Sequence, residues 1–501
     1  MSAMDSLTSE RPQPTRAFAW LALLGLACMM LFGIGISLGI DGDEITVHGL
    51  AIMITFLGLV PLVLDQGRVA QQRHLLLTLT SLVYVVYLAL PVWTLYFLGG
   101  RQIFLEEVLL IRAPEITAGL IAALIGQIFL LAGYAMPFGR LFMSVVPKPT
   151  RDWSPEISIG IALVMIPLGI AVWLGSVMGI IPTRLGSGVL GTVSQGTFYG
   201  VALLTIVYLR YRTRLVLVIL PVVVPLIMTL YFFSGMKESF FMAPAFLILA
   251  LLVTRRRIPA RWVITGIVAF VLFYPISAAF RATAWQTQNL QQSLRSPVQT
   301  ITKTIRETSG YRLREYITDG LVATASRTSS LPWLSVIVHD TPSRVPYQEG
   351  WTLSYAVLAF IPRVIWTGKP VFDTGQFITN TYGAGVDTRS STAISLVGDF
   401  YLNFGYPGIV LGMLFMGFFI RLTHELLFTV EPTIPVLFAA AIACYIIPRN
   451  IENFFSAISS GLIFALAPIV VVHFLVRSTR RSSTVVAPED GEDFIGRRLE
   501  I

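Results

Sequence analysis

The chain has 501 residues, of which 55% are hydrophobic and only 13% are charged, and its mean hydropathy is +0.74. Soluble domains carry about 25% charged residues, so this composition excludes a soluble globular protein. A net charge of +8 is also typical of nucleic-acid binding, but here the basic residues lie at the borders of apolar runs, where membrane proteins place them. We therefore expect an integral membrane protein without a nucleic-acid partner.

Apolar runs of about the length that spans a bilayer, roughly 20 residues, recur along the chain. Because a helix satisfies its backbone polar groups internally, each run predicts a transmembrane helix, about twelve in all. In chain order, the predicted spans are 18–40, 46–64, 75–98, 116–138, 157–180, 193–209, 215–234, 239–253, 262–280, 406–420, 433–447 and 455–476.

The basic residues predict the orientation of these spans. With the N-terminus inside, cytoplasmic segments carry 20 of the 36 Lys and Arg residues, short outer loops carry five, and one long outer loop carries 11. Lys and Arg favour the cytoplasmic side, so we expect both termini to be cytoplasmic. The expected parts are nine N-terminal helices (1–280), a large external loop (281–405), three C-terminal helices (406–476) and a disordered cytoplasmic tail (477–501).

The long loop has features of a folded, anion-binding segment. Apolar residues recur on one helical face at Val298, Ile301 and Ile305, and the apolar stretch 352–366 suits a helix that lies in the membrane interface or re-enters it. Its 11 basic residues exceed its seven acidic ones, and most are Arg. Arg binds phosphate oxygens in pairs, although any single Arg could equally pair with a loop acid or a lipid headgroup.

Two stretches of the loop concentrate polar side chains near the membrane. In the stretch from Phe360 to Pro370, Arg363 and Lys369 stand between prolines and Trp366. The stretch from Ser395 to Gly408 sets Asp399, Tyr401 and Asn403 at the expected mouth of the tenth span. Asp399 is a candidate acceptor-orienting base, or alternatively a cap for the following helix.

These two stretches resemble the O-antigen polymerase (Wzy-type) and oligosaccharide repeat unit polymerase family. That family has Pro-Arg, Trp and Lys-Pro in similar order, and then a Gly-acid-x-Tyr-x-Asn-Phe-Gly run before a late span. Gly350, after Tyr347 and Glu349, also fits, as does the region around Arg327. Lys237 and Glu238 stand where the family has an Arg-containing turn. The similarity covers roughly residues 230–460.

The resemblance implies an all-α, GT-C-type glycosyltransferase in the bacterial plasma membrane. Its expected substrate is an undecaprenyl-diphosphate-linked glycan, and a chain-length regulator is a candidate partner. Candidate catalytic residues are Asp399, Glu238 and His339. Candidate residues for binding the diphosphate or substrate are Arg363, Lys369, Arg281, Arg327, Arg389, Lys237, Arg449, Tyr401 and Asn403.

The expected chemistry needs no cofactor and no metal. Diphosphate is a good leaving group, and Arg or Lys can stabilise the charge that grows on it. The acids of Asp41–Glu44 could bind a divalent cation, but we interpret them as a charged turn between two spans. Two alternatives stay open: an O-antigen ligase, and a flippase or transporter of lipid-linked glycans. Transporters usually carry ionisable residues within their spans, and the predicted spans contain almost none.

Overall fold

The computed structural model describes residues 42–64, 74–93, 113–136, 152–181, 189–232, 237–255, 329–358, 361, 366, 374–382 and 392–475. Every regular element within these ranges is a helix. The first seven are α2 (Gly42–Leu64), α3 (Leu75–Leu88), α5 (Ala113–Ala135), α7 (Pro155–Val177), α8 (Val189–Tyr211), α9 (Arg214–Phe232) and α10 (Lys237–Arg255). The others are α15 (Leu331–Asp340), α16 (Trp351–Leu358), α17 (Thr374–Tyr382), α18 (Ser395–Phe428), α19 (Ile434–Arg449), the 3-10 turn η4 (Asn450–Glu452) and α20 (Phe455–Leu475).

Eight of the described helices are long and apolar enough to cross a membrane, and α3 and α10 are shorter apolar helices. These ten helices follow ten of the predicted spans in order, which confirms a multi-pass, all-α membrane protein. The predicted spans 18–40 and 262–280 lie outside the described residues.

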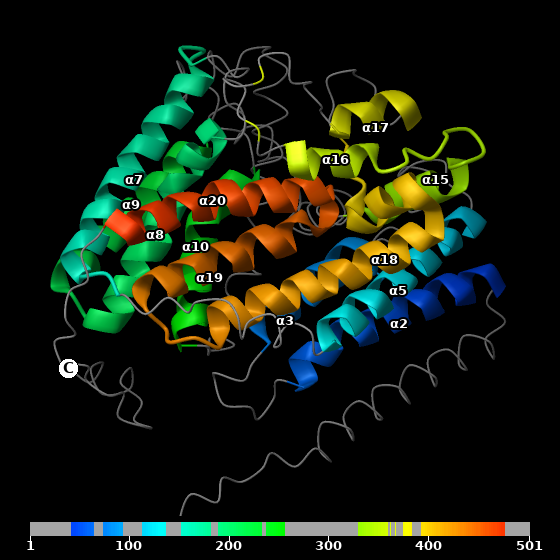
Figure 1. Ribbon diagram of the computed structural model, residues 1–501, viewed down its shortest axis with the longest axis horizontal. Coiled ribbons are helices and arrows are strands. Elements are labelled where there is room, and N and C mark those ends of the chain that lie inside the picture. Colours follow the sequence, from blue (N-terminus) through cyan, green and yellow to red (C-terminus); the bar gives the residue numbers. More distant parts are fainter. Residues whose placement is uncertain are drawn as a thin grey trace, which may run out of the picture.

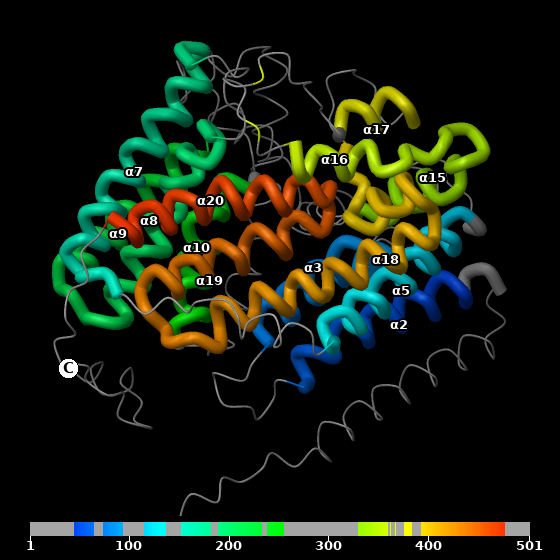
Figure 2. The backbone as a smooth tube through the Cα atoms, viewed as in Figure 1, coloured from blue at the N-terminus to red at the C-terminus, as the bar shows by residue number. Residues whose placement is uncertain are grey.

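The helices form two groups with a pair between them. Figure 1 shows α2, α5 and α18 side by side in one group and α7, α8, α9 and α10 in the other. The last hairpin, α19 and α20, runs through the middle, as the tube in Figure 2 makes clear. In the span that includes α19, 89% of the residues are buried, against 22% in that of α20, so α19 forms the centre of the bundle and α20 lies nearer its surface.

Small residues let α5 and α18 approach each other closely. A Cβ atom at Gly133 would clash with the carbonyl oxygen of Leu414, and one at Gly417 would clash with that of Leu130. Two helices that approach so closely make many van der Waals contacts with each other, and these contacts stabilise their association in lipid. This packing fixes α18 against α5 along its membrane-spanning half.

The described parts of the predicted external loop gather at one end of the bundle, which we call the loop end. There, α15 to α17 cover the bundle (Figure 1). The Ser330 amide before α15 donates to Tyr87 O near the end of α3 (3.0 Å). The loop is therefore partly helical, as predicted; its segment 298–321 lies outside the described residues.

The tenth span differs from the prediction at both ends. It was expected at 406–420, but α18 runs from Ser395 to Phe428, with non-helical backbone at Phe404 and Gly405. Polar residues at 399 and 403 led to the expectation of a loop there, whereas the structure pairs them with each other inside the protein. The break divides α18 into a short first part at the loop end and a long spanning part.

The expectation that the spans carry almost no ionisable residues is wrong for α18. Its extended end includes Arg421, His424 and Glu425, all nearly buried. Arg421 pairs with Glu425 one turn along the helix. The rings of His74 and His424 lie 5.1 Å apart, and His74 Nδ1 lies 2.6 Å from the Tyr134 hydroxyl. Mutual pairing allows these groups to be buried.

The first acidic stretch also differs slightly from its expected form. It was interpreted as a turn between two spans, but α2 already begins at Gly42, so Asp43 and Glu44 belong to the first turn of a helix. No group of three or more potential metal-ligating residues occurs within the described ranges.

Candidate functional site

Two parts of the chain that resemble the polymerase family, the segment around Gly350 and the stretch 395–408, are bonded to each other in the structure. The Gln348 amide donates to Leu402 O (2.9 Å), and the Glu349 amide donates to Asn403 O (3.3 Å). The Gly350 amide donates to the Asn403 side chain at Oδ1 (2.9 Å). The segment before α16 thus occupies the break in α18 and supplies hydrogen bonds to backbone that the break leaves unpaired.

A fully buried polar network lies beneath this contact. Asp399, Asn403 and Thr352 each have 0% of their surface exposed. Thr352 Oγ1 donates to Asp399 Oδ1 (2.5 Å), and Asn403 Nδ2 donates to Thr352 Oγ1 (2.5 Å) and to Asp399 O (2.7 Å). The Phe455 amide, at the start of α20, donates to Asp399 Oδ2 (2.9 Å). Each carboxylate oxygen has a partner, which offsets the cost of burying the acid.

This geometry changes the interpretation of Asp399. The alternative prediction, a cap for the following helix, is wrong about the helix: α18 already begins at Ser395, and Asp399 instead caps the N-terminus of α20. In this arrangement no substrate hydroxyl reaches the carboxylate, because protein groups surround it completely. We therefore assign Asp399 a positioning role, and keep the more exposed Glu238 and His339 as candidate bases.

Tyr401 is also a structural contact in this arrangement. Its hydroxyl lies within hydrogen-bond distance of Val338 O (3.2 Å) and Thr341 O (3.3 Å), and its side chain is buried. It ties the end of α15 to α18. Next to it, Thr341 Oγ1 lies 2.6 Å from the Tyr382 hydroxyl of α17. Burial raises the pKa of Tyr382 to about 12, so this hydroxyl stays protonated at neutral pH.

A second polar cluster at the loop end joins α10 to α19. Glu238 forms a two-point ion pair with Arg449, in which Nη2 lies 2.8 Å from Oε2 and Nε contacts Oε1. The Tyr445 hydroxyl donates to Glu238 Oε1 (2.6 Å). The side chains of Glu238 and Arg449 are 48% and 34% exposed, so this cluster, unlike Asp399, is open to a ligand.

The structure therefore pairs two residues that were nominated separately from the sequence. Tyr445 was not nominated, because the predicted span 433–447 ended before Arg449; α19 in fact extends to Arg449, and the spacing of four puts both residues on one face. Lys237 is the first residue of α10; its side chain is outside the description.

The two clusters meet at the short turn between α19 and α20. Arg449 ends α19, Phe455 begins α20, and η4 lies between them. Asn450 stiffens the turn, because its Nδ2 donates to Ile446 O (2.8 Å) and its Oδ1 accepts from Asn453 Nδ2 (3.1 Å). The network around Asp399 holds one side of this turn, and the Arg449–Glu238 pair holds the other.

His339 lies at the loop end in a third group of charges. Its Nδ1 is 2.9 Å from Asp340 Oδ1, and its Nε2 is 3.7 Å from Glu115 Oε1 at the start of α5. Arg344 Nη1 lies 3.0 Å from Asp340 Oδ2. These contacts link α15 to α5, and none of them reaches Glu238 or Asp399.

Five nominated basic residues lie outside the described residues, and their assignment to the diphosphate stays a prediction. They are Arg281, Arg327, Arg363, Lys369 and Arg389. The nearby Trp366 is described and is 38% exposed.

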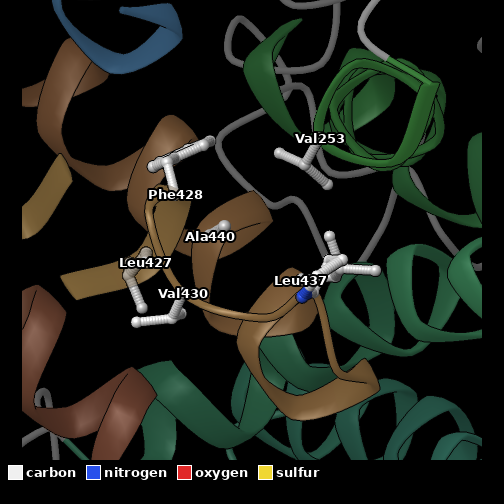
Figure 3. A pocket seen from close by; sticks show the side chains of 7 residues that line it. Val253, Leu427, Phe428, Val430, Leu437 and Ala440 are labelled. Atoms are coloured by element: carbon white, nitrogen blue, oxygen red, sulfur yellow. The ribbon is translucent and has the colours of Figure 1, made fainter. Parts of the chain in front are cut away.

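An apolar pocket lies at the opposite end of the same helices. Figure 3 shows it among the ends of α10, α18 and the start of α19. Its lining residues are Val253, Leu427, Phe428, Val430, Pro432, Leu437 and Ala440. Without a charged or hydrogen-bonding side chain in this lining, the pocket does not suit diphosphate chemistry, and the loop end remains the candidate site.

Comparisons with known proteins give one match. No curated protein and no solved structure matches the chain. The family described as Domain of unknown function (DUF8712) matches residues 51–463. This match covers most of the chain, and the chain belongs to that family.

Proposed function

We propose that the protein polymerises undecaprenyl-diphosphate-linked oligosaccharide repeat units on the outer face of the bacterial plasma membrane. The observation that carries the proposal is the hydrogen bonding between the stretch 395–408 and the segment around Gly350, both of which resemble the polymerase family. This unit shares the turn between α19 and α20 with the exposed Glu238–Arg449 pair. A buried hydrogen-bond network that supports a partly exposed ion pair is an arrangement that suits an enzyme site.

The proposed reaction is a direct glycosyl transfer. A sugar hydroxyl of one lipid-linked glycan attacks the anomeric carbon of another, a new C–O bond forms, and the bond to the diphosphate breaks with its electron pair. Glu238 accepts the hydroxyl proton, and Arg449 stabilises the charge that grows on the departing diphosphate. Binding of the diphosphate to Arg449 draws the guanidinium away from Glu238, which frees the carboxylate to act as a base.

One observation favours a second candidate, a transporter or flippase of the same lipid-linked glycans. Arg421, His424 and Glu425 are ionisable residues within a spanning helix, together with His74 at the start of α3. Such residues commonly mark transport pathways. They lie, however, at the end of the bundle opposite the loop, and Arg421 is neutralised by Glu425, so we rank transport second.

Deletion of the gene, followed by analysis of the surface polysaccharide, tests the proposal. A polymerase deletion should leave single repeat units that are still exported. Lipid-linked glycan trapped inside the cell would instead indicate a flippase, and full-length polymer that stays on its lipid would indicate a ligase. Unaltered surface polysaccharide would contradict all three functions. Complementation with the native gene controls for effects on neighbouring genes.

A further inference from the structure

Four exposed aromatic side chains surround the break in α18. Tyr347 and Trp351 come from the segment that occupies the break, and Phe404 and Tyr406 come from the break itself. Their exposed fractions are 37%, 43%, 48% and 39%, in that order. Exposed aromatic groups that gather at one place on a polar segment commonly mark a binding surface.

Two glycines bring these rings together. A Cβ atom at Gly405 would lie 2.8 Å from the Tyr347 hydroxyl, and one at Gly350 would lie 3.3 Å from Phe404 Cζ. The Tyr347 ring therefore packs over Gly405 of the other segment, and the Phe404 ring packs over Gly350. We call the four residues Tyr347, Trp351, Phe404 and Tyr406 the aromatic platform.

Neighbouring rings support the platform from below and from the side. The buried Tyr401 ring lies 6.3 Å from that of Tyr347 and 5.3 Å from that of Tyr406. Trp351 makes edge-to-face contacts with Tyr355 and Phe377, both at 5.7 Å. Because the Asp399 network fixes both segments, the platform is rigid, and a ligand that binds it loses little affinity to ordering the protein.

Polar side chains border the platform. Glu349 and Ser354 are exposed, Gln348 is partly exposed, and Gln376 of α17 is exposed. Arg344, three residues before Tyr347, has 76% of its side chain exposed. Polar and charged side chains are energetically costly among lipid tails. This border therefore indicates that the platform faces a hydrated ligand and not the hydrocarbon core of the bilayer. Flat apolar rings with carboxylate and amide groups at their edge match a pyranose, which has C–H faces and a rim of hydroxyls.

We propose that the aromatic platform binds pyranose rings of the growing glycan chain, at the same end of the bundle as the Glu238–Arg449 pair. This inference rests on the proposed function, because it takes the substrate to be a glycan. The C–H faces of the sugar pack on the negative faces of the rings, and Gln348 and Glu349 bond to its hydroxyls. The platform would hold the chain while its lipid-linked end reacts.

Binding of a soluble glycan to the full-length protein in lipid nanodiscs tests the platform. The probe is the surface polysaccharide of the producing cell, released by mild acid and labelled at its reducing end with a fluorophore. Anisotropy should show binding, and Trp351→Ala and Phe404→Ala should each raise Kd about tenfold. Tyr347→Phe keeps the ring and should change Kd less than about twofold. The control Phe474→Ala removes an aromatic side chain that is 73% exposed at the far end of α20, and should leave Kd unchanged.

A second measurement needs no change to the platform. A fluorophore attached at Ser354→Cys should respond to the glycan and should not be quenched by lipids that carry a nitroxide on their tails. Strong quenching would mean that the bilayer covers the platform, and would overturn the proposal. Unchanged affinity in both alanine variants, or a native protein that binds no glycan, would also overturn it. If the platform fails these tests but deletion of the gene still shortens the surface polysaccharide, only the platform proposal is overturned, and the proposed function stands.

Discussion

Asp399 is a buried acid whose side chain joins three segments of the protein. Its oxygens accept hydrogen bonds from Thr352 of α16, Asn403 of α18 and the first amide of α20. Asp399→Ala would leave the Thr352 hydroxyl and the Phe455 amide without their acceptor, at a cost of about 1–3 kcal/mol for each, whereas Asn403 would keep Thr352 Oγ1 and the backbone oxygen of residue 399. We expect a clear fall in the melting temperature of the purified protein, with loss of polymer in proportion.

Asp399→Asn separates the positioning role from a catalytic one. The amide keeps the shape and one acceptor oxygen, so for a positioning residue we expect moderate losses of stability and polymer together. A general base would behave otherwise, since its loss lowers the rate about 10²–10⁴-fold without lowering the melting temperature. Melting curves and polymer yield measured on the same preparations distinguish the two; normal stability without polymer would restore Asp399 as the base.

The Glu238–Arg449 pair is where we expect substitutions to affect the rate rather than the stability. Arg449→Ala removes charged contacts to the diphosphate, each of about 1.5–3 kcal/mol, and should slow transfer at least tenfold. Glu238→Gln should slow it about 10²–10⁴-fold. Arg214→Ala is the matched control, because it removes an exposed arginine side chain at the start of α9, at the opposite end of the bundle. Native polymer length and amount in Glu238→Gln would exclude this residue as the base.

The sequence nominated single residues but not the contacts between them. Asp399 and Asn403 stand four apart, a spacing that brings them together on one helix face, but the sequence predicted a loop there and so did not predict this contact. The roles of Thr352 and Phe455 could not be predicted from the sequence, because both contacts join elements far apart in the chain. The Phe455 contact also depends on a side chain that meets a backbone amide. Glu238 and Arg449 were nominated for different tasks, and only the fold brings them into one ion pair.

Among the elements, the break in α18 decides the shape of the loop end. At Gly405, φ is +65° and ψ is −149°, a conformation that is essentially restricted to glycine. Gly405→Ala would introduce backbone strain and would push its Cβ against Tyr347. We expect a loss of about 1–3 kcal/mol in the free energy of unfolding, and weaker glycan binding because the platform is displaced.

Gly160→Ala in α7 provides the control for that substitution. A Cβ atom there meets no other atom within 4 Å, and alanine favours a helix by up to about 1 kcal/mol over glycine. We expect an unchanged or slightly raised melting temperature. Equal melting temperatures for the two variants would mean that the break in α18 carries no strain and does not position the platform.

The elements themselves were largely predictable from apolar runs of bilayer length. The ten predicted spans that fall in described residues all coincide with helices, within a few residues at most ends. The exception is α18, since hydropathy assigns Asp399 and Asn403 to a loop. Polar groups that satisfy one another leave no signal in a one-dimensional pattern, so the first turns of this helix were missed.

For the molecule as a whole, the ionisable cluster at the end opposite the loop distinguishes an enzyme from a transporter. In an enzyme, Arg421 and Glu425 stabilise one another within the bundle, with Arg421 above the Tyr134 ring at 5.2 Å. Removal of one partner from a buried pair costs about 3–5 kcal/mol, whereas replacement of both by apolar residues is often tolerated. We expect low protein levels in Arg421→Met, and near-normal levels and polymer in Arg421→Met with Glu425→Leu. A stable double variant that traps glycan inside the cell would favour transport.

The remaining prediction concerns which face of the membrane each end of the bundle occupies. Among the described residues, the candidate catalytic and binding residues lie at the loop end, and the distribution of Lys and Arg predicts that this end is outside. In a protein whose Cys28 and Cys444 are replaced by Ala, we would introduce Cys at Ser343, in the exposed turn after α15, or at Glu431, in the exposed turn between α18 and α19. A membrane-impermeant thiol reagent should label Ser343→Cys in intact spheroplasts, and Glu431→Cys only after lysis. Since lipid-linked repeat units are joined outside the membrane in the proposed reaction, the reverse pattern would refute both the topology and a polymerase site at the loop end.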